Sequence, residues 1–245
     1  MYTIDDIEVK LLNENEIRSF IKNHGQIACV CYNTDEKYSE KVGLKCMESG
    51  HMSGSRGDFF KFEITAPRFT QDQIMRHEVG VFKNCQSQRY VDMDDNFSIY
   101  VPPYVMKDDY LMYRYERYEI MCKAEYKVNR DAFNKLGITG EKANDLMRTM
   151  LPIGVKSTIR IGFTLEGLIN FMEKRLCVRA DAPIQRVAQL MRDLVVEVEP
   201  RYKDLLVPQC KRLLYCPEGD EGCGGVISRE ELIEIKKMYN KNKDE

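Results

Sequence analysis

The chain has 245 residues, of which 43% are hydrophobic and 10% aromatic, a composition that supports a folded core and excludes an intrinsically disordered protein. Its 37 basic and 39 acidic residues give a net charge of −2, so we expect no nucleic-acid partner, and any anion site must be built locally. The sequence lacks the run of about eighteen apolar residues that a membrane span requires. Its N-terminus carries acids where a secretory signal carries basic residues, which predicts a cytoplasmic protein without a membrane partner.

Nine cysteines are scattered along the chain, and this odd number does not suit a disulfide framework. We therefore predict that most of them are small buried thiols. Cys210, Cys216 and Cys223 cluster near the C-terminus, but spacings of five and six residues are not those of a typical zinc ribbon, so no metal site is expected. Cys85 has two interpretations, a reactive thiol in an electropositive pocket or, more simply, a packed small side chain.

The N-terminal part of the sequence predicts a strand, a short helix and a second β-prone run. Residues Ile7–Leu12 resemble an opening strand. A helix is predicted over Glu16–Asn23, with Asn15 as its N-cap and Gly25 as its stop. The compact apolar run Ile27–Tyr32 then favours a strand.

The next segment predicts a loop, a half-buried strand and a helix. Gly50–Gly57 has the composition of a loop, and Phe59–Thr65 alternates apolar and polar residues as a half-buried strand does. Thr70 and Gln73 fit a capping box that starts a helix. Because Gln73 and Arg76 are three residues apart, such a helix places them on one face.

The C-terminal half is predicted to be mainly helical. The tyrosine-rich stretch Tyr110–Tyr126 is ambiguous by period, and we favour a helix. Apolar residues at helical spacing over Leu165–Leu176 predict an amphipathic helix. Asp181 and Pro183 are start signals for another helix that continues over Ile184–Val195.

The chain shows no internal repeat, no low-complexity linker and no abrupt change of composition. One α+β domain is the simplest interpretation of this pattern. We place that domain over residues 1–225 and expect a charged C-terminal helix or tail over residues 226–245.

The segment Gln73–Arg89 carries the residues best suited to hold an anion. Arg76, Ser87 and Arg89 supply charge-assisted and partly bidentate donors of the kind that bind a phosphate. Gln73 adds an amide that can pair with a base or a sugar. The alternative is a solvated helix face with ordinary surface arginines, since charge patterns of this kind are common.

Five motifs in the same order resemble those of the flavin-dependent thymidylate synthases, over roughly residues 50 to 225. They read Gly50-His51-x-Ser53, Arg76-His77-Glu78 followed after eight residues by Ser87-Gln88-Arg89, Arg148-x-x-Leu151-Pro152, Leu168-x-Asn170-Phe171 followed by Arg175, and the cysteine-bearing tail from Cys210 to Gly224. One such motif is weak support for a family, but five in register are strong.

The resemblance implies a fold, a reaction and partners. Members of this family are homotetramers of α+β subunits, with a mostly antiparallel sheet packed by long helices and active sites shared between subunits. They convert dUMP to dTMP with methylenetetrahydrofolate as carbon donor, FAD as hydride carrier and NADPH as reductant. Catalysis then depends mainly on holding pyrimidine, flavin and folate in contact.

The resemblance also implies roles for individual residues. The nucleotide is expected to bind Gln73, Arg76, Ser87, Gln88, Arg89, Arg148 and Arg175. Among these, Ser87 and Arg175 are the candidate catalytic residues. Arg175 is expected to stabilise the negative charge that develops on the uracil oxygens. The flavin is expected to lie against Ser53, Arg76, His77, Glu78, Asn84, Thr164, Glu166 and Asn170.

The sequence departs from the family pattern where the flavin binds. Glu78 occupies a position that is arginine in the family, and Thr164-Leu165-Glu166 replaces an Asn-Ala-Arg segment. These two changes alter the local charge by four units and bring carboxylates close to a doubly negative cofactor. In addition, Gln86 stands where the family has a glutamate near the substrate.

Three hypotheses account for these departures. In the first, the protein binds FAD through other donors, for which Arg56, Lys83 and Lys174 are candidates. Alternatively, it is a related transferase that acts on a different pyrimidine nucleotide or adds a hydroxymethyl group. The third hypothesis is a nucleotide-binding relative without redox activity.

Overall fold

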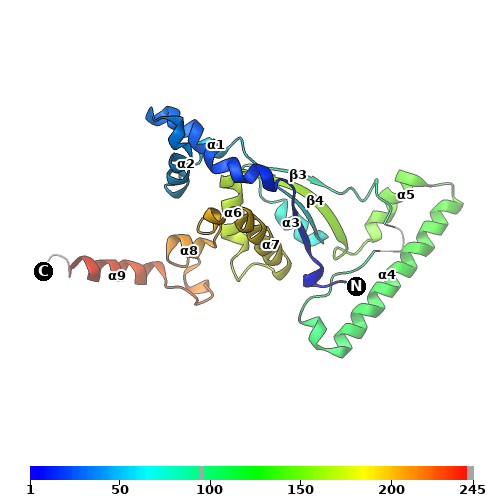
Figure 1. The fold of residues 1–245 in the computed structure, drawn as a ribbon. Coiled ribbons are helices and arrows are strands. Elements are labelled where there is room, and N and C mark those ends of the chain that lie inside the picture. The colour runs from blue at the N-terminus through cyan, green and yellow to red at the C-terminus, as the bar shows by residue number, and fades with distance from the viewer. Residues whose placement is uncertain (94–96, 242–245) are drawn as a thin grey trace. The chain divides into compact units, whose positions relative to one another are not determined.

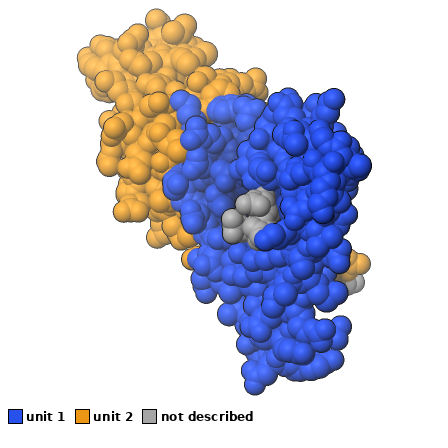
Figure 2. Space-filling view, turned by 90° about the vertical axis from the view of Figure 1, so that its right-hand side faces the viewer, with its two compact units in different colours: residues 1–10, 61–78, 82–162 blue, residues 11–60, 79–81, 163–245 orange. Residues whose placement is uncertain are grey.

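The computed structural model describes residues 1–93 and 97–241. The chain divides into two compact units, each assembled from several segments of the sequence (Figure 2). Unit 1 contains residues 1–10, 61–78 and 82–162, and unit 2 contains residues 11–60, 79–81 and 163–245. Because the segments of the two units alternate along the chain, no shift in composition marks a boundary. The extent of one domain over residues 1–225 therefore stays a prediction.

A four-stranded antiparallel sheet is the centre of unit 1. Its strands are β1 (Glu8–Leu11), β2 (Phe60–Pro67), β3 (Val81–Cys85) and β4 (Lys156–Phe163), in the spatial order β1-β2-β4-β3 (Figure 1). One terminal residue of each strand belongs to unit 2, namely Leu11, Phe60, Val81 and Phe163. Together with the helices, this sheet confirms the α+β class and the predicted strands near residues 8 and 60.

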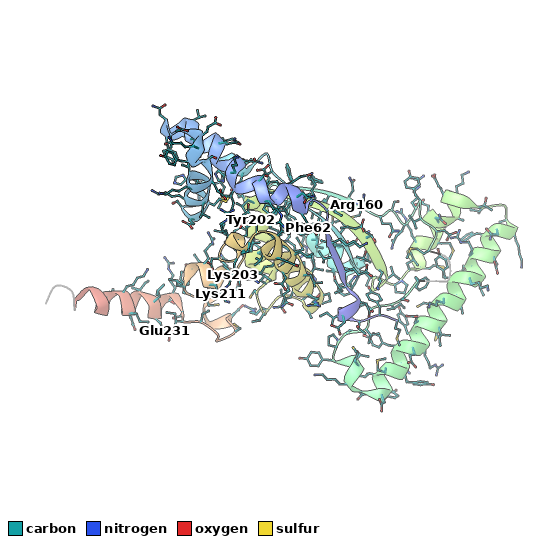
Figure 3. The ribbon with its side chains drawn as sticks, in the orientation of Figure 1. Phe62, Arg160, Tyr202, Lys203, Lys211 and Glu231 are labelled. Atoms are coloured by element: carbon teal, nitrogen blue, oxygen red, sulfur yellow. The ribbon has the colours of Figure 1, made fainter. Side chains whose placement is uncertain are left out.

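The alternation of side chains along β2 separates an apolar face from a charged one. Phe62 and Ile64 are fully buried, whereas Glu63 between them lies on the opposite face. The Glu63 carboxylate lies 3.2 Å from Lys10 Nζ on β1 and 2.8 Å from Arg160 Nη2 on β4. Figure 3 labels Phe62 and Arg160 on these neighbouring strands. The glutamate thus joins three strands, and the cations lower the pKa of its carboxyl through hydrogen bonds.

In the described part of unit 1, three α-helices accompany the sheet, namely α3 (Arg68–Ile74), α4 (Asp109–Lys135) and α5 (Gly140–Met147). Helix α4 confirms the predicted helix over the tyrosine-rich stretch, and its N-cap Asp108 accepts a hydrogen bond from the amide of Leu111. It packs beside α5 around a core of Phe97, Ile99, Tyr126, Met147 and Val155.

Unit 2 is helical. Its α-helices are α1 (Glu14–Tyr32), α2 (Ser39–Glu48), α6 (Leu165–Arg175), α7 (Ala182–Val198), α8 (Gln209–Leu213) and α9 (Arg229–Lys241). Both predicted helices after residue 164 are confirmed by α6 and α7. Phe60 stacks edge-to-face against Phe20 at 5.1 Å and against Tyr202 at 5.3 Å between ring centroids, and this aromatic group forms part of the core.

The prediction for the first helix is wrong in its length and in the role of its glycine. Helix α1 runs through Gly25 and includes Ile27–Tyr32, which the sequence favoured as a strand. A Cβ atom at Gly25 would lie 1.6 Å from the carbonyl oxygen of Ser39 and 2.8 Å from the amide nitrogen of Gly43. The glycine is therefore required for close packing of α1 against α2, which lie side by side in Figure 1.

The predicted capping box at Thr70 is also wrong. Helix α3 begins at Arg68, after Pro67, so Thr70 lies inside its first turns and is fully buried. The helix ends at Ile74, before Arg76, and so Gln73 and Arg76 do not share a helix face. The start of α3 is set by tertiary contacts, because the amides of Arg68 and Phe69 donate to the carbonyl oxygens of Val155 and Ile153, just before β4.

The expectation that most cysteines are buried is contradicted. Only Cys29 and Cys46 are buried, and the other seven are partly or fully exposed. All nine cysteines are free thiols in the structure. Among residues 1–93 and 97–241, no helix has both the length and the apolar character that a membrane span needs.

Candidate active site

Lys83 on β3 ties the loop after α3 to the strand that leads to Ser87. Its ammonium group, largely buried, donates to the carbonyl oxygens of Met75 at 2.6 Å and His77 at 2.7 Å. It also donates to Oε1 of Glu78 at 2.9 Å. The Cys85 thiol lies 3.6 Å from the Met75 sulfur and adds a second contact between loop and strand. The two halves of the Gln73–Arg89 segment are therefore held together, as an anion site requires.

The same contacts change the role of Lys83. A lysine ammonium has three hydrogens, and here each one has an oxygen acceptor within the loop. Lys83 thus fixes the loop backbone in this conformation, and the hypothesis that it is a direct donor to FAD is not favoured. Its charge also balances that of Glu78, whose side chain is 74% exposed. The glutamate that replaces the family's arginine is therefore part of an ion pair.

The segment after β3 is anchored to β4. The amide of Gln86 donates to the carbonyl oxygen of Thr158 at 2.8 Å, and the Thr158 amide donates back to the Gln86 side chain at 3.4 Å. Ser87 follows directly, and its hydroxyl accepts a hydrogen bond from the amide of Arg89 at 3.3 Å. The Arg89 guanidinium lies over the ring of Tyr90 and is exposed. Anchored backbone with an exposed guanidinium is suited to binding a dianion.

Arg148 lies after α5, in a short 3-10 helix over Arg148–Met150. Its guanidinium is half exposed and pairs with Asp145 at 2.9 Å. An exposed pair of this kind contributes little stability, about 0 to 1 kcal/mol. Arg148 can therefore exchange this partner for a ligand at low cost, in keeping with its predicted place in the nucleotide site.

The start of α6 is built on a tight contact with the turn before β3. The amide of Thr164 donates to the carbonyl oxygen of Gly80 at 2.8 Å, and the Thr164 hydroxyl caps the helix by accepting from Gly167. Gly80 has a left-handed φ of 66°, and a Cβ there would lie 2.1 Å from the Thr164 hydroxyl oxygen. Thr164 is buried, and it caps α6 and packs against Gly80. Its contact with the flavin stays a prediction.

Glu166, the second departure from the family pattern, is also beside a cation. Its Oε2 lies 3.7 Å from Nη2 of Arg56, and both side chains are exposed. Arg56 is one of the alternative donors that the sequence suggested for FAD. The two glutamates that replace arginines are thus each accompanied by a basic side chain, one in each unit.

The loop that carries Ser53 is held by a buried histidine that the sequence did not indicate. His24 of α1 is almost fully buried, and its ring lies 2.5 Å from where a Cβ at Gly54 would be. Burial lowers the pKa of His24, and a hydrogen bond with the His51 backbone opposes this shift in part. His51 itself lines a cavity of about 430 Å³. Only glycine, which has no side chain, leaves room for the His24 ring at position 54. Gly54 was therefore the feature of the sequence that could have indicated this packing.

The end of α6 carries Arg175 into a cavity of about 280 Å³ within unit 2. Lys174, the third alternative donor for FAD, and Arg179 line the same cavity. Asn170 lies one turn earlier on α6 and is partly buried. Arg175 therefore has a concave surface beside it, which fits a residue that contacts a ligand.

Cys85 has the character of a packed side chain. Burial raises the pKa of its thiol, and the neighbouring cations Arg68 and Lys83 oppose that shift only in part. A thiol with a raised pKa is mostly protonated near neutral pH and is a weak nucleophile. The simpler of the two interpretations of Cys85 is therefore favoured.

The predicted site residues fall into two groups, one in each unit. Unit 1 holds Gln73, Arg76, His77, Glu78, Asn84, Ser87, Gln88, Arg89 and Arg148. Unit 2 holds Ser53, Thr164, Glu166, Asn170 and Arg175. His77 is buried, whereas Arg76 in the turn after α3 is exposed. Within unit 1, the contacts of Lys83 and Cys85 join the loop of Arg76 to the strand before Ser87. The individual roles of all these residues stay predictions.

Comparison with known proteins identifies the family. The family model described as thymidylate synthase complementing protein matches residues 16–201. The flavin-dependent thymidylate synthase of Nitratidesulfovibrio vulgaris is 33% identical over 188 residues, 76% of each chain, and that of Clostridium tetani is 28% identical over 84% of this chain and 82% of the relative. A UMP/dUMP methylase, PolB from Streptomyces cacaoi bound with 5-Br dUMP, shares the fold with a TM-score of 0.64 at 17% identity, covering 84% of this chain and 96% of that one. The chain belongs to the thymidylate synthase complementing protein family.

Proposed function

We propose that this protein is a methyltransferase of the flavin-dependent thymidylate synthase type, which converts dUMP to dTMP. The relatives at 28% and 33% identity carry that name, and the fold is shared with a UMP/dUMP methylase. The observation that carries the proposal is the connection through Lys83 between the loop of Arg76 and the strand that leads to Ser87 and Arg89. It gives the two cationic parts of the phosphate site a common rigid support.

Each binding residue has a task that follows from its chemistry. Arg76, Ser87 and Arg89 hold the phosphate through charge-assisted hydrogen bonds. Arg148 and Arg175 face the uracil, and the Arg175 guanidinium stabilises negative charge that develops on the ring oxygens during carbon transfer. Gln73 and Gln88 supply amides that orient the base and the sugar.

A flavin is the cofactor that we propose, with methylenetetrahydrofolate as carbon donor and NADPH as reductant. When bound, the flavin supplies the hydride that reduces the transferred carbon to a methyl group. The residues fit an anionic cofactor because Lys83 is 2.9 Å from Glu78 and Arg56 is 3.7 Å from Glu166. These cations offset the charge of the two carboxylates, and the exposed guanidinium of Arg56 is free to turn toward a phosphate. Ser53, His77, Asn84 and Asn170 would supply neutral polar contacts.

We further propose a homotetramer in the cytoplasm. Helix α4 has 27 residues, and only Glu119 and Tyr126 on it are buried among the described residues. Large apolar side chains are exposed along it, including Tyr110, Tyr113, Tyr118, Ile120, Met121 and Val128. A long helix with so much exposed apolar surface is typical of an interface between subunits. Shared active sites would then draw residues from neighbouring copies.

The visible spectrum of the purified full-length protein, with and without added FAD, is the first test. We expect the absorbance of oxidised flavin, and turnover of dUMP to dTMP with methylenetetrahydrofolate and NADPH. Mass analysis of the products from dUMP and from UMP separates methyl from hydroxymethyl transfer and identifies the nucleotide that is used. A protein that stays colourless with FAD, and that dUMP stabilises without turnover, would show a binding protein instead.

A further inference from the structure

Four of the nine cysteines line one cavity in unit 2. This cysteine cavity, of about 280 Å³, is formed by the end of α6, the residues that follow it and the segment from Pro208 to Val226. Its thiols belong to Cys177, Cys210, Cys216 and Cys223. The sequence indicated only the last three as a cluster. The fold adds Cys177, which lies two residues after Arg175 on the same wall.

The thiols of the cysteine cavity are not arranged around a common point. Among the described residues, no group of three or more His, Cys, Asp or Glu side chains is placed to hold one metal ion. A structural zinc site needs four ligands that converge in a tetrahedron at about 2.3 Å from the ion. All four cysteines are free thiols. The arrangement therefore favours thiol chemistry over a metal centre.

Two of the four thiols belong to one tight loop. The Cys216 sulfur lies 2.8 Å from where a Cβ at Gly222 would be, and Gly222 immediately precedes Cys223. The loop reverses at Gly219, whose φ is 55°, and the Cys216 amide donates to the carbonyl oxygen of Ile227 at 2.9 Å. The Cys216 thiol thus points at the backbone that carries Cys223. A disulfide needs such proximity, with Cα atoms about 4.4 to 6.8 Å apart.

We propose that Cys216 and Cys223 are a redox-active thiol pair that forms a reversible disulfide by exchange with small-molecule disulfides such as oxidised glutathione. Cys223 is exposed and is the thiol that reacts first. Its thiolate attacks one sulfur of oxidised glutathione, and one glutathione thiolate leaves. The Cys216 thiolate then attacks the Cys223 sulfur and releases the second glutathione thiolate. The protein loses two electrons and two protons, and oxidised glutathione becomes two molecules of glutathione.

The loop of the thiol pair is fastened beside Arg175. Glu218, inside the loop, lies 3.2 Å from Arg179, and Arg212 on α8 forms an ion pair with Glu173 on α6. Helices α8 and α9, marked in Figure 3 by Lys211 and Glu231, precede and follow the loop in the chain. A disulfide across the loop would fix one wall of the cavity that Arg175 lines. This consequence for nucleotide binding rests on the proposed function, whereas the disulfide itself does not.

Peptide mapping of the full-length protein tests the proposal directly. The reduced protein is equilibrated with glutathione buffers of increasing oxidised fraction, quenched by alkylation and digested with trypsin. Cys216 and Cys223 lie together in the tryptic peptide Leu213–Arg229, while Cys177 and Cys210 fall in other peptides. We expect that peptide to lose two hydrogens and to escape alkylation in oxidising buffer. Alkylation of both thiols at every ratio would overturn the proposal, as would cross-links to Cys177 or Cys210.

Two variants and a zinc-binding assay distinguish the proposed disulfide from other reactions of these thiols. In Cys223→Ser the disulfide cannot form, and Leu213–Arg229 should be alkylated at Cys216 or carry one glutathione. Cys122→Ser on α4 should behave as the wild type does. Stoichiometric zinc that protects all four thiols from alkylation would establish a metal site and overturn the redox pair. The dUMP-induced rise in melting temperature is measured on both redox forms, and its absence in both would contradict the proposed function while leaving the peptide result intact.

Discussion

At the scale of single residues, Glu78 and Lys83 form the ion pair on which the candidate phosphate site depends. Glu78 looks unfavourable in the sequence, because it stands where the family has an arginine. In the structure it lies 2.9 Å from Lys83, which also donates to two backbone carbonyls of the same loop. A buried ammonium with three acceptors fixes the loop that presents Arg76. Lys83 is therefore a positioning residue.

Replacing Lys83 by methionine should weaken both the loop and nucleotide binding. Two backbone carbonyls and the Glu78 carboxylate lose their donor, which should cost about 1 to 3 kcal/mol in the free energy of unfolding. Chemical denaturation and dUMP titration measure the two effects. The same change at the exposed Lys142 of α5 is the control and should leave both unchanged. Normal dUMP affinity in a folded Lys83→Met protein would contradict the positioning role.

Replacing Glu78 by glutamine tests whether the carboxylate faces the flavin phosphates. Its side chain is 74% exposed, so the change should alter the stability of the protein by less than about 0.5 kcal/mol. If the flavin binds beside it, loss of the negative charge should tighten FAD binding, and more strongly at low salt. Fluorescence titration with FAD at two ionic strengths measures this. An unchanged affinity at both salt concentrations would place Glu78 away from the cofactor.

At the scale of elements, close packing decided the structure where the local sequence pattern was ambiguous. Strand β2 and helices α6 and α7 are predicted because their apolar residues repeat at the period of the element, whereas the period over the α4 stretch is ambiguous and a helix is only favoured there. Helix α1 was predicted as a short helix followed by a strand because Gly25 resembles a stop. The backbone of α2 lies so close to Gly25 that no side chain fits there, and this contact is not visible in a local pattern.

Replacing Gly25 by alanine should destabilise the protein although alanine is the better helix former. The gain in helix propensity is about 1 kcal/mol. A Cβ atom 1.6 Å from the Ser39 carbonyl oxygen forces α1 and α2 apart, and the net loss should be about 1 to 3 kcal/mol. The midpoint of urea unfolding measures it. Gly57→Ala is the matched control, since open space surrounds that position, and equal midpoints for all three proteins would contradict the packing role.

Glu119 on α4 should make stability depend on acid pH. Burial alone would raise the pKa of its carboxyl, but hydrogen bonds from Lys123, the Ile99 amide and the amino group of Met1 lower it overall. The pKa of this carboxyl in the folded protein therefore lies below its value of about 4.3 in the unfolded chain. The contribution of ionised Glu119 to the free energy of unfolding is complete above about pH 4.3 and is lost as the pH falls through the folded-state pKa.

Glu119→Gln should therefore be less stable than the wild type at pH 7, by about 1 to 3 kcal/mol, and this gap should close as pH falls below about 4. Thermal unfolding followed from pH 7 to pH 3 measures the gap. The exposed Glu125 on the same helix is the control for the same substitution and should show no gap at either end. A gap for Glu119→Gln that stays constant over this range would refute the linkage.

At the scale of the whole molecule, the proposed subunit interface rests on the large apolar side chains that α4 exposes. Replacing Ile120, which is 65% exposed, by glutamate should shift the protein to a smaller assembly because a charge in an apolar interface is unfavourable. Light scattering after size-exclusion chromatography measures the mass. Val30→Glu, at an exposed apolar position on α1, is the control, and an unchanged mass for Ile120→Glu would contradict an interface on α4.

The sequence by itself determined the family and the α+β class and predicted the residues of the candidate site, because motifs in register and periodic apolar residues are local properties of the chain. It also identified Glu78 and Glu166 as the departures that matter. The tertiary structure decided what those departures mean, since Lys83 and Arg56 approach them only in the folded chain. It likewise decided the length of α1 and the gathering of Cys177 with the tail cysteines. Arg56 and Glu166, and Cys177 and the tail cysteines, are distant in sequence, and the turn that brings Lys83 to Glu78 depends on the packing of the loop, so no local pattern encodes these contacts.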